Sequence, residues 1–133
     1  MANNPVSHID LRVRSFESVG NFYRQILPAI GFTEDRSGEG WIGFYADGAF
    51  PSRAFFGLSE DPQHRVNGTR IAFWAASRKE VDRIGGIVIQ AGAINVEGPA
   101  LNPEYGDGYY AIFFEDPEGN KYEVVCREEG KPD

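Results

Sequence analysis

The chain has 133 residues, of which 41% are hydrophobic and 14% aromatic, and its formal net charge is −7. This length is enough for one domain with a real core, and the aromatic side chains supply much of its apolar area. The negative charge argues against nucleic acid and anionic membranes as partners, since both require clustered Lys and Arg. No stretch approaches the roughly 18 apolar residues of a transmembrane helix. With one cysteine, no internal disulfide is possible, and the polar opening residues 1–5 show no signal-peptide pattern, so we expect a cytoplasmic protein.

The first half of the chain reads as a strand, a helix and three short strands. Residues 6–14 alternate between polar and apolar side chains, which is typical of a half-buried strand. Ser15 is a candidate helix N-cap, and apolar residues then recur at helical spacing until Pro28 and Gly31, which we expect to end the helix. Turn sequences rich in glycine separate the strands that follow, predicted at 31–36, 40–46 and 53–59.

A polar link at 60–69 leads to a second half with the same order of elements. A strand is predicted at 70–76, and Ser77-Arg78-Lys79-Glu80 fits the capping box that begins a helix. We expect this helix to reach about Ala91 and to stop at Gly92, although Gly85 and Gly86 weaken it by roughly 1 kcal/mol each relative to alanine. That glycine pair suggests close packing.

The chain closes with a strand, a long loop and a hairpin. We expect a strand near 93–97 and then a Gly/Pro/Asn-rich loop over 98–107. The last two strands are predicted at 108–115 and 120–127. Between them, the turn at 116–120 has Pro in its second position and Gly two positions later, which strongly favours a hairpin.

The sequence pattern of the first strand and helix repeats 62 positions later, which indicates two copies of one supersecondary unit. At this offset His8 is equivalent to Arg70. We therefore predict an α+β fold, a single domain over 1–133 with two β-α-β-β-β units at 6–59 and 69–127. In each unit one helix covers one face of a small mixed sheet. Two such units placed side by side form an incomplete barrel around a cleft.

Strand alternation predicts which side chains face this cleft. Ile9 and its neighbours of the same parity face the helix, so His8 faces the cleft, and by the same argument Arg70 and Trp74 do so in the second unit. Glu123 lies on the last strand. We expect His8, Arg70 and Glu123 to converge although they are far apart in sequence.

This trio has more than one chemical use. Histidine and carboxylate suit a divalent first-row metal, whereas arginine carries no lone pair and cannot be a ligand. The alternative for His8 is a hydrogen bond to Glu123 or Asp10, and the alternative for Glu123 is a salt bridge with Arg70. Arg70 can also clamp a carboxylate or phosphate of a substrate. His64, in the polar link, is expected to be solvated, with a role as substitute ligand as the alternative.

Aromatic side chains are divided between the core and the cleft. Trp74 is expected to contact substrate because its parity places it on the cleft face. Tyr109 is of a type more often found in the core, but it lies near a loop well placed to act as a lid and is a second candidate for substrate contact. Cys126 is expected to be a buried, inert thiol facing the helix. The remaining candidates are expected in the core: Trp41, Tyr45, Phe55, Tyr105 and Tyr110.

Several segments resemble the vicinal oxygen chelate superfamily, which contains glyoxalases, bleomycin-resistance proteins and extradiol dioxygenases. Residues 7–10 (SHID) resemble its opening strand, 21–23 (NFY) its first helix, and 70–73 (RIAF) the strand that opens its second unit. The closing hairpin at 109–123 (YYAIFFEDPEGNKYE) is the most specific match. The resemblance covers residues 6–127 and implies a glyoxalase-like fold.

The resemblance also implies a ligand set for a divalent metal such as Mn, Fe, Ni or Zn. His8 matches the first ligand position and Glu123 the last, while Arg70 stands where the middle histidine is usually found. The position that closes the first unit falls near Phe55 or Phe56, which cannot bind a metal. The chain thus keeps two ligand-type residues and has lost one or two.

Two functional hypotheses follow. The first is a lyase, isomerase or dioxygenase acting on a small oxygen-bearing molecule, with a degraded metal site held by His8 and Glu123 and with Glu123 and Arg70 as catalytic residues. The second is a non-catalytic protein that binds a small molecule or drug, as bleomycin-resistance proteins do, without a protein-bound metal. The resemblance further implies a homodimer, for which the open sheet edges provide a route.

Overall fold

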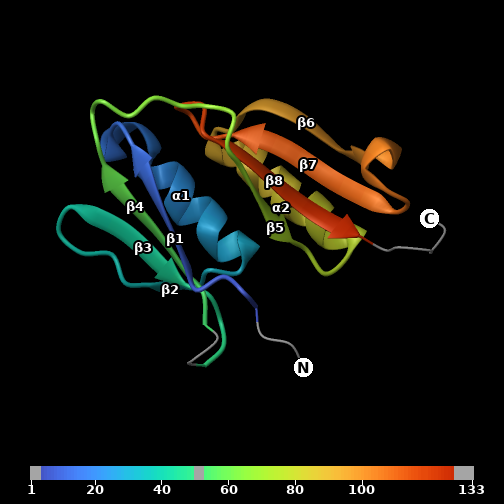
Figure 1. Cartoon of the computed structure of the whole chain (residues 1–133), viewed down its shortest axis with the longest axis horizontal. Helices are drawn as coiled ribbons and strands as arrows, with labels where there is room; N and C mark the ends of the chain where they lie inside the picture. Colours follow the sequence, from blue (N-terminus) through green and yellow to red (C-terminus); the bar gives the residue numbers. More distant parts are fainter. Residues whose placement is uncertain (1–3, 50–52, 128–133) are drawn as a thin grey trace. The chain divides into compact units, whose positions relative to one another are not determined.

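The computed structural model describes residues 4–49 and 53–127, and the chain divides into two compact units, residues 1–65 and 66–133. Each unit has a four-stranded mixed sheet and one helix (Figure 1). The predicted α+β architecture of two β-α-β-β-β units is therefore confirmed. No helix of the described ranges is long and apolar enough to cross a lipid bilayer.

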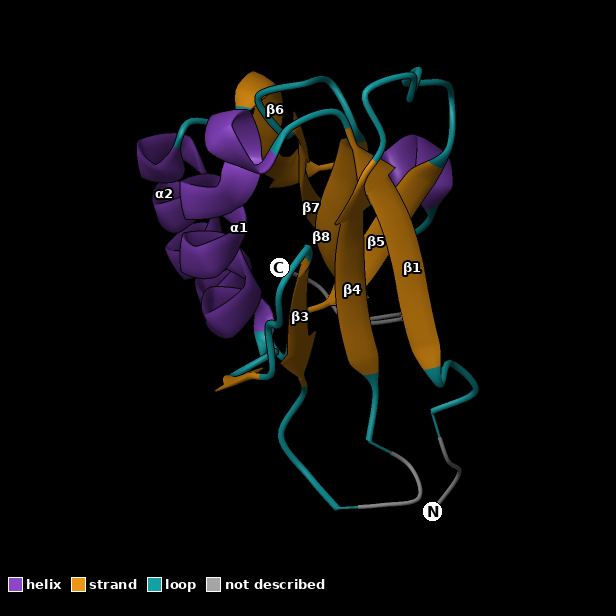
Figure 2. Ribbon diagram, turned by 90° about the vertical axis from the view of Figure 1, so that its left-hand side faces the viewer, coloured by secondary structure: helices purple, strands orange, loops and turns teal. Residues whose placement is uncertain are grey.

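The first unit contains β1 (His8–Val13), α1 (Phe16–Ile30), β2 (Glu34–Asp35), β3 (Trp41–Tyr45) and β4 (Phe55–Glu60). Its strands are ordered β1-β4-β3-β2, with β1 parallel to β4 and the other neighbours antiparallel. The parallel pair sets His8 opposite Phe55. Figure 2 shows β1, β4 and β3 side by side, with α1 on one side of these strands.

The second unit repeats this plan with β5 (Arg70–Trp74), α2 (Arg78–Ala91), β6 (Ile94–Leu101), β7 (Tyr109–Glu115) and β8 (Lys121–Arg127). Its strands are ordered β5-β8-β7-β6, and again the first and last strands are the parallel pair. A short 3-10 helix, η1 (Pro103–Tyr105), lies between β6 and β7.

Helix α1 begins as predicted but ends later than Pro28. The Ser15 side chain accepts a hydrogen bond from the backbone N–H of Glu17 at 3.1 Å, which caps the first turn. The helix continues through Pro28 to Ile30 and is ended by Gly31, whose φ is 130°. Proline in a helix leaves the carbonyl four residues earlier without its donor. Here that residue is Arg24, which is exposed, so water can satisfy the carbonyl and the helix is not broken.

The core of the first unit forms between α1 and one face of its sheet. The ring of Tyr23 stacks on Phe56 with centroids 6.3 Å apart, and Phe32 meets the same ring at 5.6 Å. Phe56 and Leu58 of β4 are 0% and 1% exposed. Complete burial of each such side chain contributes about 1.5–3 kcal/mol. This burial fixes the register of β4, so its alternate residues must face away from the helix.

Only half of the predicted capping box forms at the start of α2. The Ser77 side chain accepts a hydrogen bond from the backbone N–H of Glu80 at 3.1 Å. The Glu80 carboxylate does not return a bond to Ser77 but pairs with Arg83 at 2.8 Å. An i,i+3 partner on the same helix face therefore competes successfully for the carboxylate. The helix ends at Gly92, as expected.

The two neighbouring glycines of α2 have different environments. A Cβ at Gly85 would lie 3.1 Å from Cδ1 of Ile112 and 3.2 Å from Cγ of Pro99, whereas a Cβ at Gly86 would have no heavy atom within 4 Å. Close packing of α2 on β6 and β7 therefore accounts for Gly85. Nothing in the structure explains Gly86.

The predicted loop at 98–107 is wrong in its first part, because β6 extends to Leu101. Strand β6 is the edge strand, where a proline such as Pro99 removes no ladder hydrogen bond. Two register shifts against β7, on either side of Glu97, and a φ of 94° at Gly98 bend the strand. These irregularities use loop-type residues, so the local sequence pattern is that of a loop.

The β7–β8 hairpin is confirmed. Asp116 is completely buried, and its carboxylate accepts backbone hydrogen bonds from Glu118 and Asn120, both at 2.9 Å. Cys126 of β8 is 3% exposed, which confirms the expected buried thiol.

Candidate functional site

The candidate site residues lie on the face of each sheet that is turned away from its helix, called here the helix-free face. In the second unit Phe73 stacks on Tyr122 on the helix side, so the alternate residues face the other way. The predicted parity of β5 and β8 is consistent with this. The helix-free face of the second sheet is formed by Arg70, Ala72, Trp74, Tyr109, Ala111, Phe113, Glu115, Lys121, Glu123, Val125 and Arg127.

A buried carboxylate lies at the centre of this face. Glu123 is 5% exposed, and the hydroxyl of Tyr109 donates a hydrogen bond to its Oε2. Burial, and then this bond to Glu123, raises the pKa of the Tyr109 hydroxyl from 10.0 to about 12. Tyr109 therefore stays a donor at neutral pH and holds the Glu123 carboxylate in place. The direct role of Tyr109 in the site is thus support of Glu123, while its contact with a substrate stays a prediction.

Arg70 does not pair with Glu123. On β5 it lies opposite Lys121, whereas Glu123 lies opposite Ala72, and the guanidinium of Arg70 is placed 5.0 Å above the ring of Phe113. No carboxylate of the described ranges lies within 4.0 Å of it. The alternative of an Arg70–Glu123 salt bridge is therefore wrong, because a cation–π contact and an exposed position hold the guanidinium instead.

Trp74 marks the other end of β5 and is 70% exposed. The guanidinium of Arg127 lies 5.4 Å from the centroid of its ring and 5.3 Å from that of Tyr109. Trp74 and Arg70 are four residues apart on one strand, a separation of about 13 Å. Between them lies only the small side chain of Ala72.

The 3-10 helix η1 folds back over this face. The ring of Tyr105 lies 5.3 Å from Tyr109 and 6.1 Å from Phe113. Tyr105 itself is 58% exposed, so its expected place in the core is wrong. Its ring covers other aromatic rings instead of being covered, because it belongs to a surface turn.

The other carboxylate of this face, Glu115, has hydrogen-bond partners on neighbouring strands. Glu115 accepts hydrogen bonds from Asn95 at 2.9 Å and from Lys121 at 3.0 Å. These bonds, that of Asn95 foremost, lower the pKa of the Glu115 carboxyl. Among the described residues Arg70 and Arg127 form no ion pair with a carboxylate within 4.0 Å, although the charge of Arg70 contributes to the lowered pKa of Glu115.

In the first unit, His8 and Asp10 are neighbours on the exposed side of β1. Nε2 of His8 lies 3.8 Å from Oδ2 of Asp10, and Nδ1 of His8 is 3.1 Å from the hydroxyl of Ser7. The side chains of His8 and Asp10 are 58% and 63% exposed. The alternative in which His8 contacts Asp10 thus has a contact in the structure, while convergence of His8 with Arg70 and Glu123 stays a prediction.

The strand register corrects the position that closes the first unit. Glu123 is paired with Ala72, whose counterpart in the first unit is Asp10, and Asp10 is paired with Gly57. The counterpart of Glu123 is therefore Gly57 and not Phe55 or Phe56. Sequence offset alone missed this because the two units differ in loop length.

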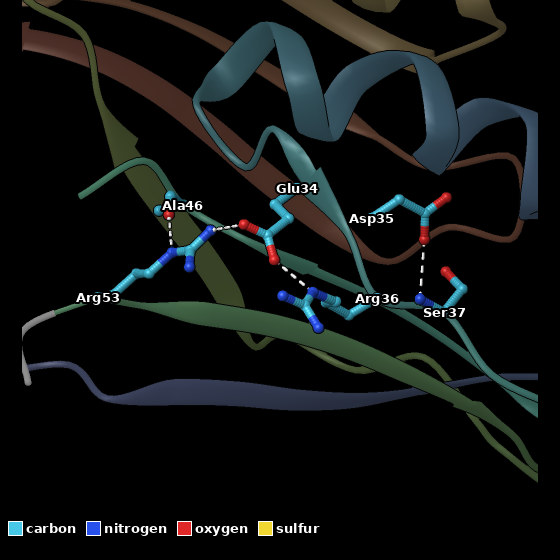
Figure 3. Close-up of polar contacts among 6 residues, drawn as sticks. All are labelled: Glu34, Asp35, Arg36, Ser37, Ala46 and Arg53. Carbon is cyan, nitrogen blue, oxygen red and sulfur yellow. Dashed lines mark hydrogen bonds and ion pairs between the residues drawn. The ribbon is translucent and has the colours of Figure 1, made fainter. Parts of the chain in front are cut away.

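A chain of ion pairs joins β2 to the start of β4 (Figure 3). Arg53 and Arg36 both donate to the carboxylate of Glu34, and Nε of Arg53 donates to the carbonyl of Ala46 at 2.7 Å. The bond from Arg53, and then that from Arg36, lowers the pKa of the Glu34 carboxyl. These residues were not singled out in the sequence, since only folding brings 34 and 53 together. Their role is structural.

The residues present match a metal site of the expected type only in part. At the four strand positions compared above, His8 and Glu123 have donor atoms, while Gly57 and Arg70 have none to offer. Neither unit contains, within its described residues, three or more His, Cys, Asp or Glu side chains grouped to share an ion. Catalytic metal sites usually have three protein ligands.

Comparisons with known proteins give a consistent family. A family model described as Glyoxalase/Bleomycin resistance protein/Dioxygenase superfamily matches residues 6–124. The uncharacterized protein YqjT of Bacillus subtilis (strain 168) is 28% identical over 123 residues, which are 90% of this chain and 96% of that protein.

Solved structures show the same fold. A glyoxalase/bleomycin resistance protein from Albidiferax ferrireducens T118 has a TM-score of 0.72 at 21% identity, with 94% of this chain and 100% of that chain covered. A family enzyme from Burkholderia phytofirmans PsJN has a TM-score of 0.65 at 15% identity, with 92% and 98% covered. At these identities the likeness concerns the fold alone.

Proposed function

The chain belongs to the Glyoxalase/Bleomycin resistance protein/Dioxygenase superfamily, and we propose that within it this protein binds a small molecule without a resident metal ion. The observation that carries this proposal is the replacement of two of the four ligand positions by Arg70 and Gly57. An always-charged guanidinium at one position repels a divalent cation, and a glycine at another offers it no donor.

The helix-free face of the second unit supports a specific kind of ligand. Arg70 and Arg127 are cations that lie over aromatic rings, and among the described residues neither forms an ion pair with a carboxylate within 4.0 Å. Trp74 offers a large exposed apolar surface about 13 Å from Arg70. An aromatic molecule with one carboxylate matches this arrangement, with its ring on Trp74 and its charge at a guanidinium. In this site Tyr109 holds the Glu123 carboxylate in position through its hydrogen bond.

A binding experiment tests this site. In a Trp41→Phe variant, Trp74 is the remaining tryptophan, and its fluorescence is followed while 1-naphthoate or neutral 1-naphthylmethanol is added in a buffer with chelator. We expect saturable binding of naphthoate and about tenfold weaker binding of the alcohol. Arg127→Gln removes the guanidinium that lies 5.4 Å from the centroid of the Trp74 ring, and it should weaken naphthoate about tenfold. Arg65→Gln, the same charge change at an exposed residue of the link, should not. Equal affinity of both probes would refute the site.

An enzyme remains the second candidate, favoured by the burial of Glu123 at 5% exposure, since buried acids gather at functional sites. In this hypothesis Glu123 and Arg70 are catalytic and His8 with Glu123 holds a divalent metal. Metal content decides between the two. The protein is purified without chelator or histidine tag and reloaded with Mn, Fe, Ni or Zn. We expect no tightly held ion, and about one ion per chain, lost in His8→Ala, would overturn the proposal of a metal-free protein.

A homodimer is also proposed, and light scattering on the purified chain tests it.

A further inference from the structure

We propose a second site, on the helix-free face of the first unit, that recognises a quaternary ammonium group through three aromatic rings and the carboxylate of Asp10. It rests on residues of the first unit alone, so it stands or falls independently of the proposed function. Three aromatic side chains that were expected in the core form its surface: Trp41, Tyr45 and Phe55.

The three rings form one continuous surface across β3 and β4. The centroid of the Phe55 ring lies 5.8 Å from that of Trp41 and 4.8 Å from that of Tyr45, with interplanar angles of 53° and 60°. Trp41 is 37% exposed, and Phe55 and Tyr45 are half-buried. The rings are therefore tilted against each other, with part of their surface open to solvent.

Glycines beneath the rings make this arrangement possible. Gly43 and Gly57 are paired across β3 and β4. A Cβ at Gly43 would collide with Phe55 and Trp41, and a Cβ at Gly57 would lie 3.0 Å from Cε2 of Phe55. The rings thus occupy the layer directly above the backbone, where side chains would otherwise stand. At the equivalent paired positions the second unit has Phe113 and Glu123 in place of the two glycines.

A carboxylate with little competition lies at the edge of the floor. Oδ1 of Asp10 is 3.0 Å from the same Cβ position at Gly57 that the Phe55 ring approaches. Its side chain is 63% exposed, and within the described ranges its one contact of ion-pair distance is to Nε2 of His8, at 3.8 Å. Arg12, two residues along the same strand, donates to the carbonyl of Leu11 at 3.2 Å instead of pairing with it.

The rings already attract a cation at one point. The guanidinium of Arg53 lies 4.8 Å above the ring of Tyr45. Arg53 also donates to the carboxylate of Glu34, as Figure 3 shows, which offsets part of its charge. Cation–π attraction contributes most when the cation is poorly hydrated.

The chemistry of the surface selects the type of cation. A primary ammonium carries three N–H donors and is strongly hydrated, so it needs several acceptors. Here the backbone of Gly43 and Gly57 is engaged in strand pairing, and Asp10 is the acceptor at the edge. A trimethylammonium group needs no acceptor, contacts rings through its methyl groups and is attracted by one nearby carboxylate. The net charge of −7 favours the approach of such a ligand.

Choline and its uncharged carbon isostere, 3,3-dimethylbutan-1-ol, are the probes that test this site. Binding to a Trp74→Phe variant is followed by Trp41 fluorescence and by the upfield shift of the choline methyl resonance, which ring currents produce. We expect saturable choline binding and at least roughly tenfold weaker binding of the isostere. Asp10→Asn should weaken choline several-fold and leave the isostere unchanged, whereas Asp107→Asn, the same charge change in the second unit, should change neither.

Three outcomes would overturn the inference. The first is equal affinity for choline and the isostere, and the second is no saturable binding of choline. The third is an equal effect of Asp10→Asn and Asp107→Asn on choline binding. Because Asp10 is on the surface, a folding failure is not expected, and circular dichroism of the variant checks this. The two sites also fail separately, since naphthoate binding is read from Trp74 and choline binding from Trp41.

Discussion

Removal of one hydroxyl, in Tyr109→Phe, tests the account of the Glu123 site most directly. The substitution leaves the ring in place and deletes the hydrogen bond to a carboxylate that is 5% exposed. Loss of a hydrogen bond to a charged buried acceptor costs about 2 kcal/mol. For a chain of 133 residues, the usual entropy of unfolding converts this to a fall in Tm of about 7 °C. The measurement is thermal unfolding followed by circular dichroism at pH 7.

Tyr110→Phe is the matched control, since it deletes the same atom from the next residue. The hydroxyl of Tyr110 donates to Asp82 at 2.6 Å, but Asp82 is exposed, and water can replace the lost donor. We expect a cost below about 1 kcal/mol for this control. If Tyr109→Phe shifts Tm no more than Tyr110→Phe, Glu123 does not depend on its tyrosine partner and the reasoning fails.

The alkaline pH range gives a second readout of the same pair. The pKa of Tyr109 is about 12 in the folded chain and 10.0 when unperturbed, so between these values the folded state keeps a proton that the unfolded state has lost. The stabilisation from Tyr109 is therefore complete below pH 10 and is lost as pH rises toward 12. The difference in unfolding free energy between wild type and Tyr109→Phe should narrow from pH 8 to pH 11. A constant difference would contradict the raised pKa.

Two further pairs of variants test the packing of each unit. Gly86→Ala should stabilise the chain by about 1 kcal/mol through helix propensity, whereas Gly85→Ala should lose this gain or destabilise, because its Cβ meets two side chains at 3.1 and 3.2 Å. Equal Tm values for the two would refute the close approach of α2. Arg53→Gln should cost about 1–2 kcal/mol, since the Arg53 side chain is 14% exposed, while Arg36→Gln should cost less than about 0.5 kcal/mol, since the Arg36 side chain is 62% exposed. The pKa of Glu34 is lowered, so the stabilisation by Arg53 should be present at pH 7 and fade as pH falls below the ordinary value of 4.5. Urea unfolding of wild type and Arg53→Gln at pH 7 and pH 3.5 measures this loss. An equal difference in unfolding free energy at both pH values would count against the ion pair.

Much of the fold can be predicted from the spacing of apolar residues, because in most elements this local spacing agrees with the side that packs in the core. The alternation in β1 and the spacing in α1 both reflect burial against the same core, so the sequence predicts them together. Strand β6 is the exception. Its Gly98 and Pro99 are loop residues locally, and only pairing with β7 at a sheet edge makes them part of a strand.

The site is less readable from the sequence than the fold. His8, Arg70 and Trp74 were found by parity, which needs only a strand and one buried side. The role of Gly57 depends on the register between β1 and β4, which are more than forty residues apart, and no local pattern reports it. The position of the Phe55 ring likewise depends on Gly43, which folding brings beneath it from the neighbouring strand β3.

The reactivity of the buried Cys126 thiol reports local unfolding of the second unit. It is the only thiol of the sequence and is 3% exposed in the core of the second unit, so a thiol reagent can reach it only when that unit opens. The rate of modification at increasing reagent concentration therefore measures how often the second unit opens under native conditions. A ligand that binds the second unit should slow this reaction in proportion to its occupancy, whereas choline, bound to the first, should slow it only if the two units open together.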